Sequence, residues 1–140
     1  MKILRWIVLS CLLISAGSAL IYAQDMDEKQ DKLAVLWVSG DRDVAEKSCL
    51  MYTHAAKQNH WFDEVVLIVW GPSAKLLAEN EALQNKLKAM AKDGVILEAC
   101  IACANSYGVT DKLKKMGIDV KGMGMPLTDY MKKGWHVLTF

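Results

Sequence analysis

The sequence lacks a dominant charge of either sign. Its 140 residues include 17 Lys and Arg and 16 Asp and Glu, which gives a formal net charge of +1 at pH 7. The basic residues are scattered, whereas proteins that bind nucleic acid gather Lys and Arg into a patch or a stripe. We therefore expect no nucleic-acid partner.

Cysteine is also scarce, and its pattern excludes two classes of protein. There are four cysteines, and Cys11 lies in an apolar N-terminal segment, so Cys49, Cys100 and Cys103 remain. An odd number argues against a disulfide scaffold in an exported protein and leaves at least one free thiol. A structural zinc site needs four ligands, and no second Cys or His pair has a matching spacing. We therefore predict no metal and no cofactor.

No apolar run has the length of a permanent membrane span. The longest, residues 6–20, has about 15 residues, whereas a spanning helix needs roughly 20. Lys2 and Arg5 precede it and small residues follow it, which is the order of a secretory signal peptide. We predict that residues 1–23 are a signal peptide and residues 24–32 a polar spacer. The protein would then be exported to the periplasm and would meet the membrane only through the export signal. An uncleaved membrane anchor remains the alternative.

What the sequence does contain, over residues 33–140, is an alternation of apolar runs and amphipathic segments. The apolar runs predict buried strands, and the segments with three- and four-residue spacing predict helices. Strands are expected at residues 33–39, 64–70, 95–99, 118–120 and 135–139, and helices at 44–59, 73–78, 81–92, 101–107, 110–116 and 127–132. This alternation predicts one α/β domain with a parallel five-stranded sheet that helices cover on both faces.

Cys100 is the residue most suited to chemistry. It follows the third expected strand and precedes a helix, and reactive groups gather at the carboxyl ends of parallel strands. A helix N-terminus also favours the thiolate, which is the nucleophilic form. Cys103 lies one helical turn later, close enough to resolve an intermediate on Cys100. We therefore predict catalytic roles for Cys100 and Cys103. Two buried cysteines that only pack a strand–helix junction remain the alternative.

The segment Cys100-Ile-Ala-Cys-Ala-Asn-Ser-Tyr-Gly-Val109 resembles the region around the active cysteine of the DsrE/DsrF/TusD family of sulfur-relay proteins. The likeness continues through residues 114–118, 122–126 and 135–140. It implies a three-layer α/β/α fold (DsrEFH-like) over residues 33–140, a persulfide on Cys100, and assembly into trimers or hexamers. Cys103 is an addition that is not general to the family.

The same resemblance implies a sulfur donor or acceptor protein, or a small sulfur species, as the partner. The best-known relatives hand sulfur along in the cytoplasm, and an export signal does not fit their role in tRNA thiolation. Whether this protein is a sulfurtransferase enzyme, a carrier or a thiol-redox protein is left open, because family membership alone does not settle function.

Glu98 and the three histidines are weaker candidates. Glu98 lies two residues before Cys100 and could tune the thiol or act as a base, but we expect it to face the helix layer or solvent. His54, His60 and His136 are expected to be exposed or to have packing roles, and we assign none of them to catalysis.

A second hypothesis from a different class remains. Met123 and Met125, with the cysteines, could form a soft Cu(I) site, although Met also fills irregular gaps in cores. Gly71-Pro-Ser73 follows a strand and precedes a helix, so its N–H groups could hold an anion. The alternative function is therefore a non-catalytic, oligomeric binding module for a small anion or a soft metal ion, with structural cysteines.

Overall fold

The structure is a computed structural model, and it describes residues 31–140. The expected signal peptide and most of the polar spacer lie outside the described residues.

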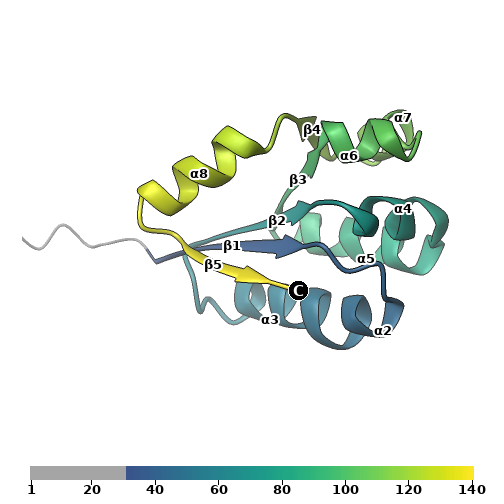
Figure 1. Ribbon diagram of the computed structural model, residues 1–140. Coiled ribbons are helices and arrows are strands. Elements are labelled where there is room, and N and C mark those ends of the chain that lie inside the picture. The colour runs from purple at the N-terminus through teal and green to yellow at the C-terminus, as the bar shows by residue number, and fades with distance from the viewer. Residues whose placement is uncertain (1–30) are drawn as a thin grey trace, which may run out of the picture.

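The centre of the fold is a five-stranded parallel sheet with the order β4-β3-β2-β1-β5 (Figure 1). Every strand pair in it is parallel. The strands are β1 (Lys32–Trp37), β2 (Glu64–Val69), β3 (Ile96–Cys100), β4 (Asp119–Lys121) and β5 (His136–Thr139). The predicted α/β fold with a parallel five-stranded sheet is confirmed, because every expected strand forms within about two residues of its predicted bounds.

The helices follow the strands in the expected order. They are α2 (Arg42–Val44), the π-helical turn η1 (Ala45–Cys49), α3 (Leu50–Gln58), α4 (Pro72–Glu79), α5 (Glu81–Lys92), α6 (Ile101–Ser106), α7 (Thr110–Lys115) and α8 (Gly124–Lys132). The bounds of α5 agree with the prediction. The helix expected over residues 44–59 is instead divided by η1. The last helix begins three residues earlier than expected, because Pro126 falls in its first turn, where a proline is tolerated.

Ser73 is not the N-cap of helix α4, and its side chain bonds to the strands instead. Gly71, with φ of 69°, is the N-cap of α4, and Pro72 occupies the first turn. The Ser73 hydroxyl is buried and donates to the carbonyl oxygen of Trp37 at 2.6 Å, while the N–H of Trp70 donates to it at 3.1 Å. Ser73 therefore links the end of β2 to the end of β1. These two hydrogen bonds hold the turn that begins α4 beside the carboxyl edge of the sheet.

The two faces of the sheet are covered unequally. Side chains alternate between the faces along each strand, and one set, which includes Leu33, Val35 and Leu67, packs with the apolar residues of α3 and α5 in the larger core. The opposite set packs against α8, and we call this side of the sheet the α8 face. It carries Ala34, Val66, Ile68, Glu98 and Cys100.

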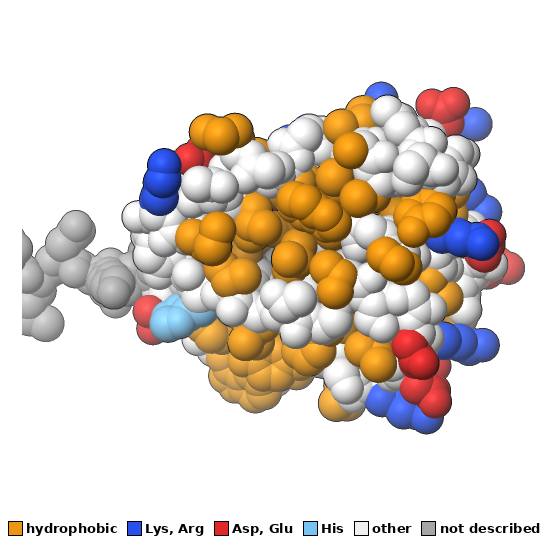
Figure 2. All heavy atoms as spheres, viewed as in Figure 1, with side chains coloured by type: hydrophobic (Ala, Val, Ile, Leu, Met, Phe, Trp, Pro, Cys, Tyr) orange, Lys and Arg blue, Asp and Glu red, His pale blue; other side chains and the backbone are white. Residues whose placement is uncertain are grey.

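On the α8 face, one helix forms the covering layer, and none of its residues is buried. Leu36, Trp70, Trp135 and Val137 pack on this face but remain only partly buried. Figure 2 shows hydrophobic side chains gathered over the middle of the sheet beside α8. The three-layer α/β/α arrangement is therefore present, with a second helical layer that leaves much apolar surface open.

No helix within residues 31–140 is both long and apolar enough to cross a membrane.

Candidate functional site

Cys100 is the last residue of β3 and also the N-cap of α6, with an extended backbone (φ −74°, ψ 116°). Its side chain lies on the α8 face, and only 6% of the residue is exposed. In the sheet it is paired with Lys121 of β4. The predicted position at the carboxyl end of the third strand is therefore confirmed, and the thiol is buried there.

Cys103 lies in the first turn of α6, beside Cys100 and more exposed than it. The pKa of Cys103 is raised, first by burial and then by the neighbouring Cys100 thiol, while the backbone of Gly71 acts in the opposite direction. Both cysteines are free thiols. The structure thus brings the two predicted site residues together, and the turn that begins α4 lies against them.

Cys49 belongs to the core, as expected for a cysteine on the inner face of a helix. It is 0% exposed and packs on the side of the sheet opposite to the α8 face. Burial raises the pKa of the Cys49 thiol to about 12. It therefore stays protonated at physiological pH and serves as an internal control for thiol chemistry.

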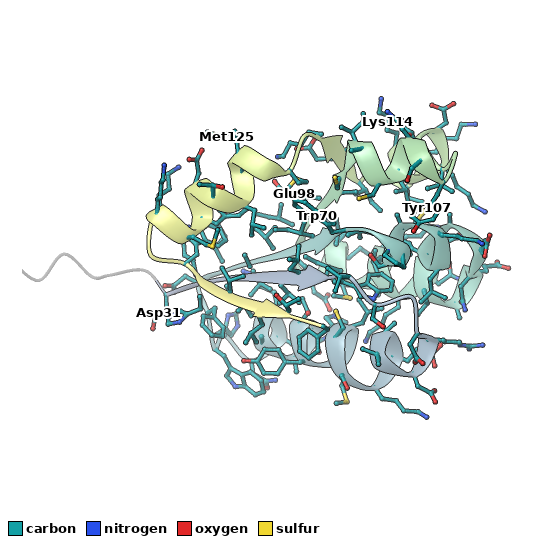
Figure 3. The ribbon with its side chains drawn as sticks, in the orientation of Figure 1. Asp31, Trp70, Glu98, Tyr107, Lys114 and Met125 are labelled. Carbon is teal, nitrogen blue, oxygen red and sulfur yellow. The ribbon has the colours of Figure 1, made fainter. Side chains whose placement is uncertain are left out.

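Glu98 is the residue whose importance the sequence did not reveal. Its side chain faces the helix layer, which is one of the two expected orientations. It is only 4% exposed and shares the α8 face with Cys100. Its Oε1 accepts hydrogen bonds from Lys121 Nζ at 2.6 Å and from the Tyr130 hydroxyl at 3.0 Å. Its Oε2 is buried and has no hydrogen-bond partner. Figure 3 shows Glu98 on the side of the sheet that α8 covers.

The charges around Glu98 are fixed by these contacts. Lys121 also donates to Asp119 at 2.6 Å, and its hydrogen bonds to Asp119 and to Glu98 raise its pKa. Burial, followed by the hydrogen bond to Glu98, raises the pKa of Tyr130 to about 12. Lys121 is therefore an ammonium and Tyr130 a neutral donor over the whole physiological range.

The other candidates lie apart from the thiols or do not fit a site. His54 is buried between α3 and α5, where its Nε2 lies 2.6 Å from Asp93 Oδ2 and its Nδ1 lies 2.8 Å from Lys86 Nζ. This packing role agrees with the expectation. His136, at the start of β5, is exposed and far from the carboxyl edge.

Of the two methionines considered for a soft metal, Met123 packs in the same cluster as Cys100 and is 1% exposed, whereas Met125 is 68% exposed on α8. Within residues 31–140, no group of three or more His, Cys, Asp and Glu side chains could hold a metal ion. A metal centre on this face would therefore depend on thiol and thioether sulfur.

An open depression of about 300 Å³ lies near the carboxyl ends of β1 and β2. It is lined by Gly40, Pro72, Lys75, Leu76, Glu79 and Tyr107. Tyr107, which Figure 3 places beside α4, ends the helix that Cys100 begins. The depression therefore reaches the end of α6, but neither Cys100 nor Cys103 lines it.

The burial of the three thiols predicts an order of alkylation. Iodoacetamide should label Cys103 first, Cys100 more slowly and Cys49 not at all in the folded protein. Because the pKa of Cys103 is raised, its labelling rate should increase as the pH rises above neutrality, since the thiolate is the reactive form. Peptide mass spectrometry of timed samples measures all three rates. Labelling of Cys49 as fast as Cys103 would contradict this order.

Comparison with known proteins identifies a family, and the solved structures that this chain resembles include the two given below. The model of the DsrE/DsrF-like family matches residues 31–140. The solved structure of BT1422 from Bacteroides thetaiotaomicron, a conserved protein of unknown function, is 34% identical. It has a TM-score of 0.75 over 79% of this chain and 95% of that chain.

A more distant likeness concerns the fold alone. The ychN protein from E. coli is 16% identical, with a TM-score of 0.61 over 79% of this chain and 99% of that chain. No curated protein matches significantly.

Proposed function

Because this chain belongs to the DsrE/DsrF-like family, we propose that it is a sulfur carrier, with sulfane sulfur held as a persulfide on Cys100 and with Cys103 as the auxiliary thiol. The observation that supports this most is the pair of adjacent free thiols at the carboxyl end of β3. In parallel sheets, this edge is where reactive groups and ligands gather.

The chemistry requires no cofactor. The Cys100 thiolate attacks the outer sulfur of a donor persulfide, a new S–S bond forms on Cys100, the S–S bond of the donor breaks, and the donor leaves as a thiol. An acceptor thiol can then remove the outer sulfur by the same exchange. The partner is thus a sulfur donor or acceptor protein, or a small sulfur species such as polysulfide.

The Cys100 persulfide can also react with Cys103 of the same chain. Attack of its thiolate on the inner sulfur forms a Cys100–Cys103 disulfide and releases hydrosulfide. An external dithiol must then reduce that disulfide before the next cycle, with two electrons passing from the dithiol. The adjacency of the two sulfur atoms supports this reaction.

The burial of Cys100 suits a carrier. A persulfide is lost when a stray thiol attacks it, and a residue that is 6% exposed is shielded from such thiols. Cys103 is more exposed than Cys100, and a small sulfur species can enter such a buried site more easily than a bulky donor can.

Treatment of the reduced protein with polysulfide tests the proposed function. The peptide that contains Cys100 should gain the mass of one sulfur atom, and the Cys49→Ala variant should gain it equally. An unmodified Cys100 peptide under conditions that modify a free cysteine would count against a sulfur carrier.

We also propose that the protein assembles with itself, as a trimer or hexamer, through the open part of the α8 face. Leu36, Trp70, Trp135 and Val137 leave apolar area there that one helix does not cover. Burial of apolar area is the main driving force for association.

A pair of variants on one strand tests this assembly. Val137 lies on the α8 face, whereas the adjacent Leu138 lies on the other face and is 38% exposed. Val137→Glu should shift the protein towards monomers in sedimentation velocity at micromolar concentration, because a carboxylate would be buried in the interface. Leu138→Glu is the matched control and should leave the oligomer intact. A wild-type protein that sediments only as a monomer would refute the proposal.

Export to the periplasm is proposed from the order of charge, apolar run and small residues in the N-terminal segment. The mature chain should begin near Gln24, and N-terminal sequencing of the protein from whole cells measures this. An intact Met1 in the membrane fraction would favour the uncleaved anchor.

One observation favours the alternative of a binding module. Met123 is buried in the same cluster as Cys100, with Cys103 packed against it, and two thiolates with a thioether are ligands that suit Cu(I). Anaerobic competition with a chromogenic Cu(I) chelator tests this alternative. Tight binding that Met123→Leu weakens, together with no persulfide loading, would replace the carrier proposal.

A further inference from the structure

Glu98 carries an unsatisfied oxygen beside the proposed sulfur site. Its Oε2 is buried without a hydrogen-bond partner, in a residue that is 4% exposed. A buried acceptor that is left unpaired lowers the stability of the fold, so such groups are rare, and a catalytic role is one explanation for them. Glu98 can act in the proposed site only if its carboxylate can reach a thiol. Whether it can depends on where Glu98 and the cysteines lie on the sheet.

Strand geometry places Glu98 next to Cys100. The two residues are separated by one position on β3, so their side chains project from the same face of the sheet as neighbours. The paired residues of β4, Asp119 and Lys121, project from this face too. On the β2 side, Glu98 is paired with Ile68, which is apolar.

The contacts of Glu98 fix one oxygen and leave the other free. Lys121 from β4 and Tyr130 from α8 both donate to Oε1, and these bonds hold the carboxylate in one orientation. In the described part of the chain, the S–H donors on this face are Cys100 and the packed Cys103. Neither thiol donates to Oε2 in this structure, so a rotation of the Cys100 side chain on the same face has to bring its S–H group to the free oxygen.

We propose that Glu98 is the proton acceptor of the sulfur-transfer site, an assignment that rests on the proposed function. As Cys100 attacks a donor persulfide, its S–H bond breaks and an O–H bond forms on Glu98 Oε2. The S–S bond to Cys100 forms while the S–S bond of the donor breaks. The proton then passes from Oε2 to the departing sulfur, which leaves as a thiol. The carboxylate returns to its starting state, and no oxidant or reductant is consumed.

The test compares two carboxylates that share one lysine. Glu98→Gln keeps the size of the side chain and an acceptor for Tyr130, but it removes the proton acceptor. Asp119→Asn is the matched control, because Asp119 accepts from the same Lys121 at the same distance of 2.6 Å and is mostly exposed. The measurement is the rate of persulfide loading on Cys100 from a small-molecule persulfide donor, from pH 5.5 to pH 9.5.

A proton acceptor contributes on the order of 10²-fold to such rates. Glu98→Gln should therefore load about 10²-fold more slowly at pH 7, and its rate should recover as the pH approaches that at which a free thiol ionises, roughly 8.5. Asp119→Asn should follow the wild-type profile. A merely structural role for Glu98 would lower the rate equally at every pH, and that result would overturn the proposal.

The wild-type protein provides a second measurement that does not depend on the folding of a variant. With a proton acceptor present, its loading rate should change little between pH 6 and pH 8. A tenfold increase for each pH unit over this range would show that only spontaneously formed thiolate reacts, and would overturn the role of Glu98. In that case loading itself would still occur, whereas failure of the proposed function would appear as no loading at any pH.

Discussion

Cys100→Ser is expected to abolish persulfide formation while leaving the fold intact. A serine hydroxyl cannot hold sulfane sulfur under these conditions, so the loss should be complete. The fold should tolerate the change because Cys100 is the N-cap of α6 and makes no side-chain capping bond. Serine is a preferred N-cap residue, and its hydroxyl can accept from the free N–H groups of the first turn.

The same variant separates the carrier from a purely structural cysteine pair. If Cys100 only fills the strand–helix junction, the substitution would have no chemical phenotype, whatever its effect on stability. Urea denaturation measures the stability, and mass spectrometry after polysulfide treatment measures the loading. Equal loading of the wild type and of Cys100→Ser would remove the main functional claim.

Cys103→Ser should have the opposite effect on the intermediate. Without the auxiliary thiol, the Cys100 persulfide cannot be converted into the Cys100–Cys103 disulfide, so it should form normally and last much longer. The partly exposed position of Cys103 allows the new hydroxyl to reach water, so little stability should be lost.

The lifetime of the persulfide and the release of hydrosulfide measure this effect in a single experiment. The wild type should release hydrosulfide and accumulate the disulfide, whereas Cys103→Ser should do neither. Unchanged kinetics in the variant would assign Cys103 to packing alone. Cys49→Ala is the control, because Cys49 is 0% exposed and lies in the other core.

The position of the thiols could be predicted from the sequence because the features that fix it are local. An apolar run that ends at residue 99 and a helical pattern that begins at residue 101 place Cys100 at the junction to within one residue. The three-residue spacing then places Cys103 one helical turn away. Such short-range patterns depend on backbone geometry rather than on the remainder of the fold.

The surroundings of the thiols could not be predicted in the same way. Alternation along β3 alone puts Glu98 on the same face as Cys100, and this signal was available in the sequence. The partners of Glu98, however, lie 23 and 32 residues away, at Lys121 and Tyr130. Their approach depends on strand order and on the path of α8 across the sheet, which local periodicity does not specify.

The division of the first long helix was missed for a related reason. The apolar spacing over residues 44–59 fits a continuous α-helix, and Cys49, Thr53 and Ala56 are all buried. A π-helical turn nevertheless covers Ala45–Cys49. One extra residue in a turn rotates the helix without changing the hydrophobicity of its residues. The composition of the segment therefore does not indicate a π-helical turn.

The most direct test of the central claim is mass spectrometry of the protein purified from its native compartment, with free thiols blocked at the moment of lysis. We predict a persulfide on the peptide that contains Cys100, and a Cys100–Cys103 disulfide in the molecules that have released their sulfur. Cys49 should appear as an unmodified thiol. A protein in which Cys100 is recovered only as a free thiol, even in cells supplied with a sulfane sulfur source, would contradict the proposal that Cys100 carries sulfur.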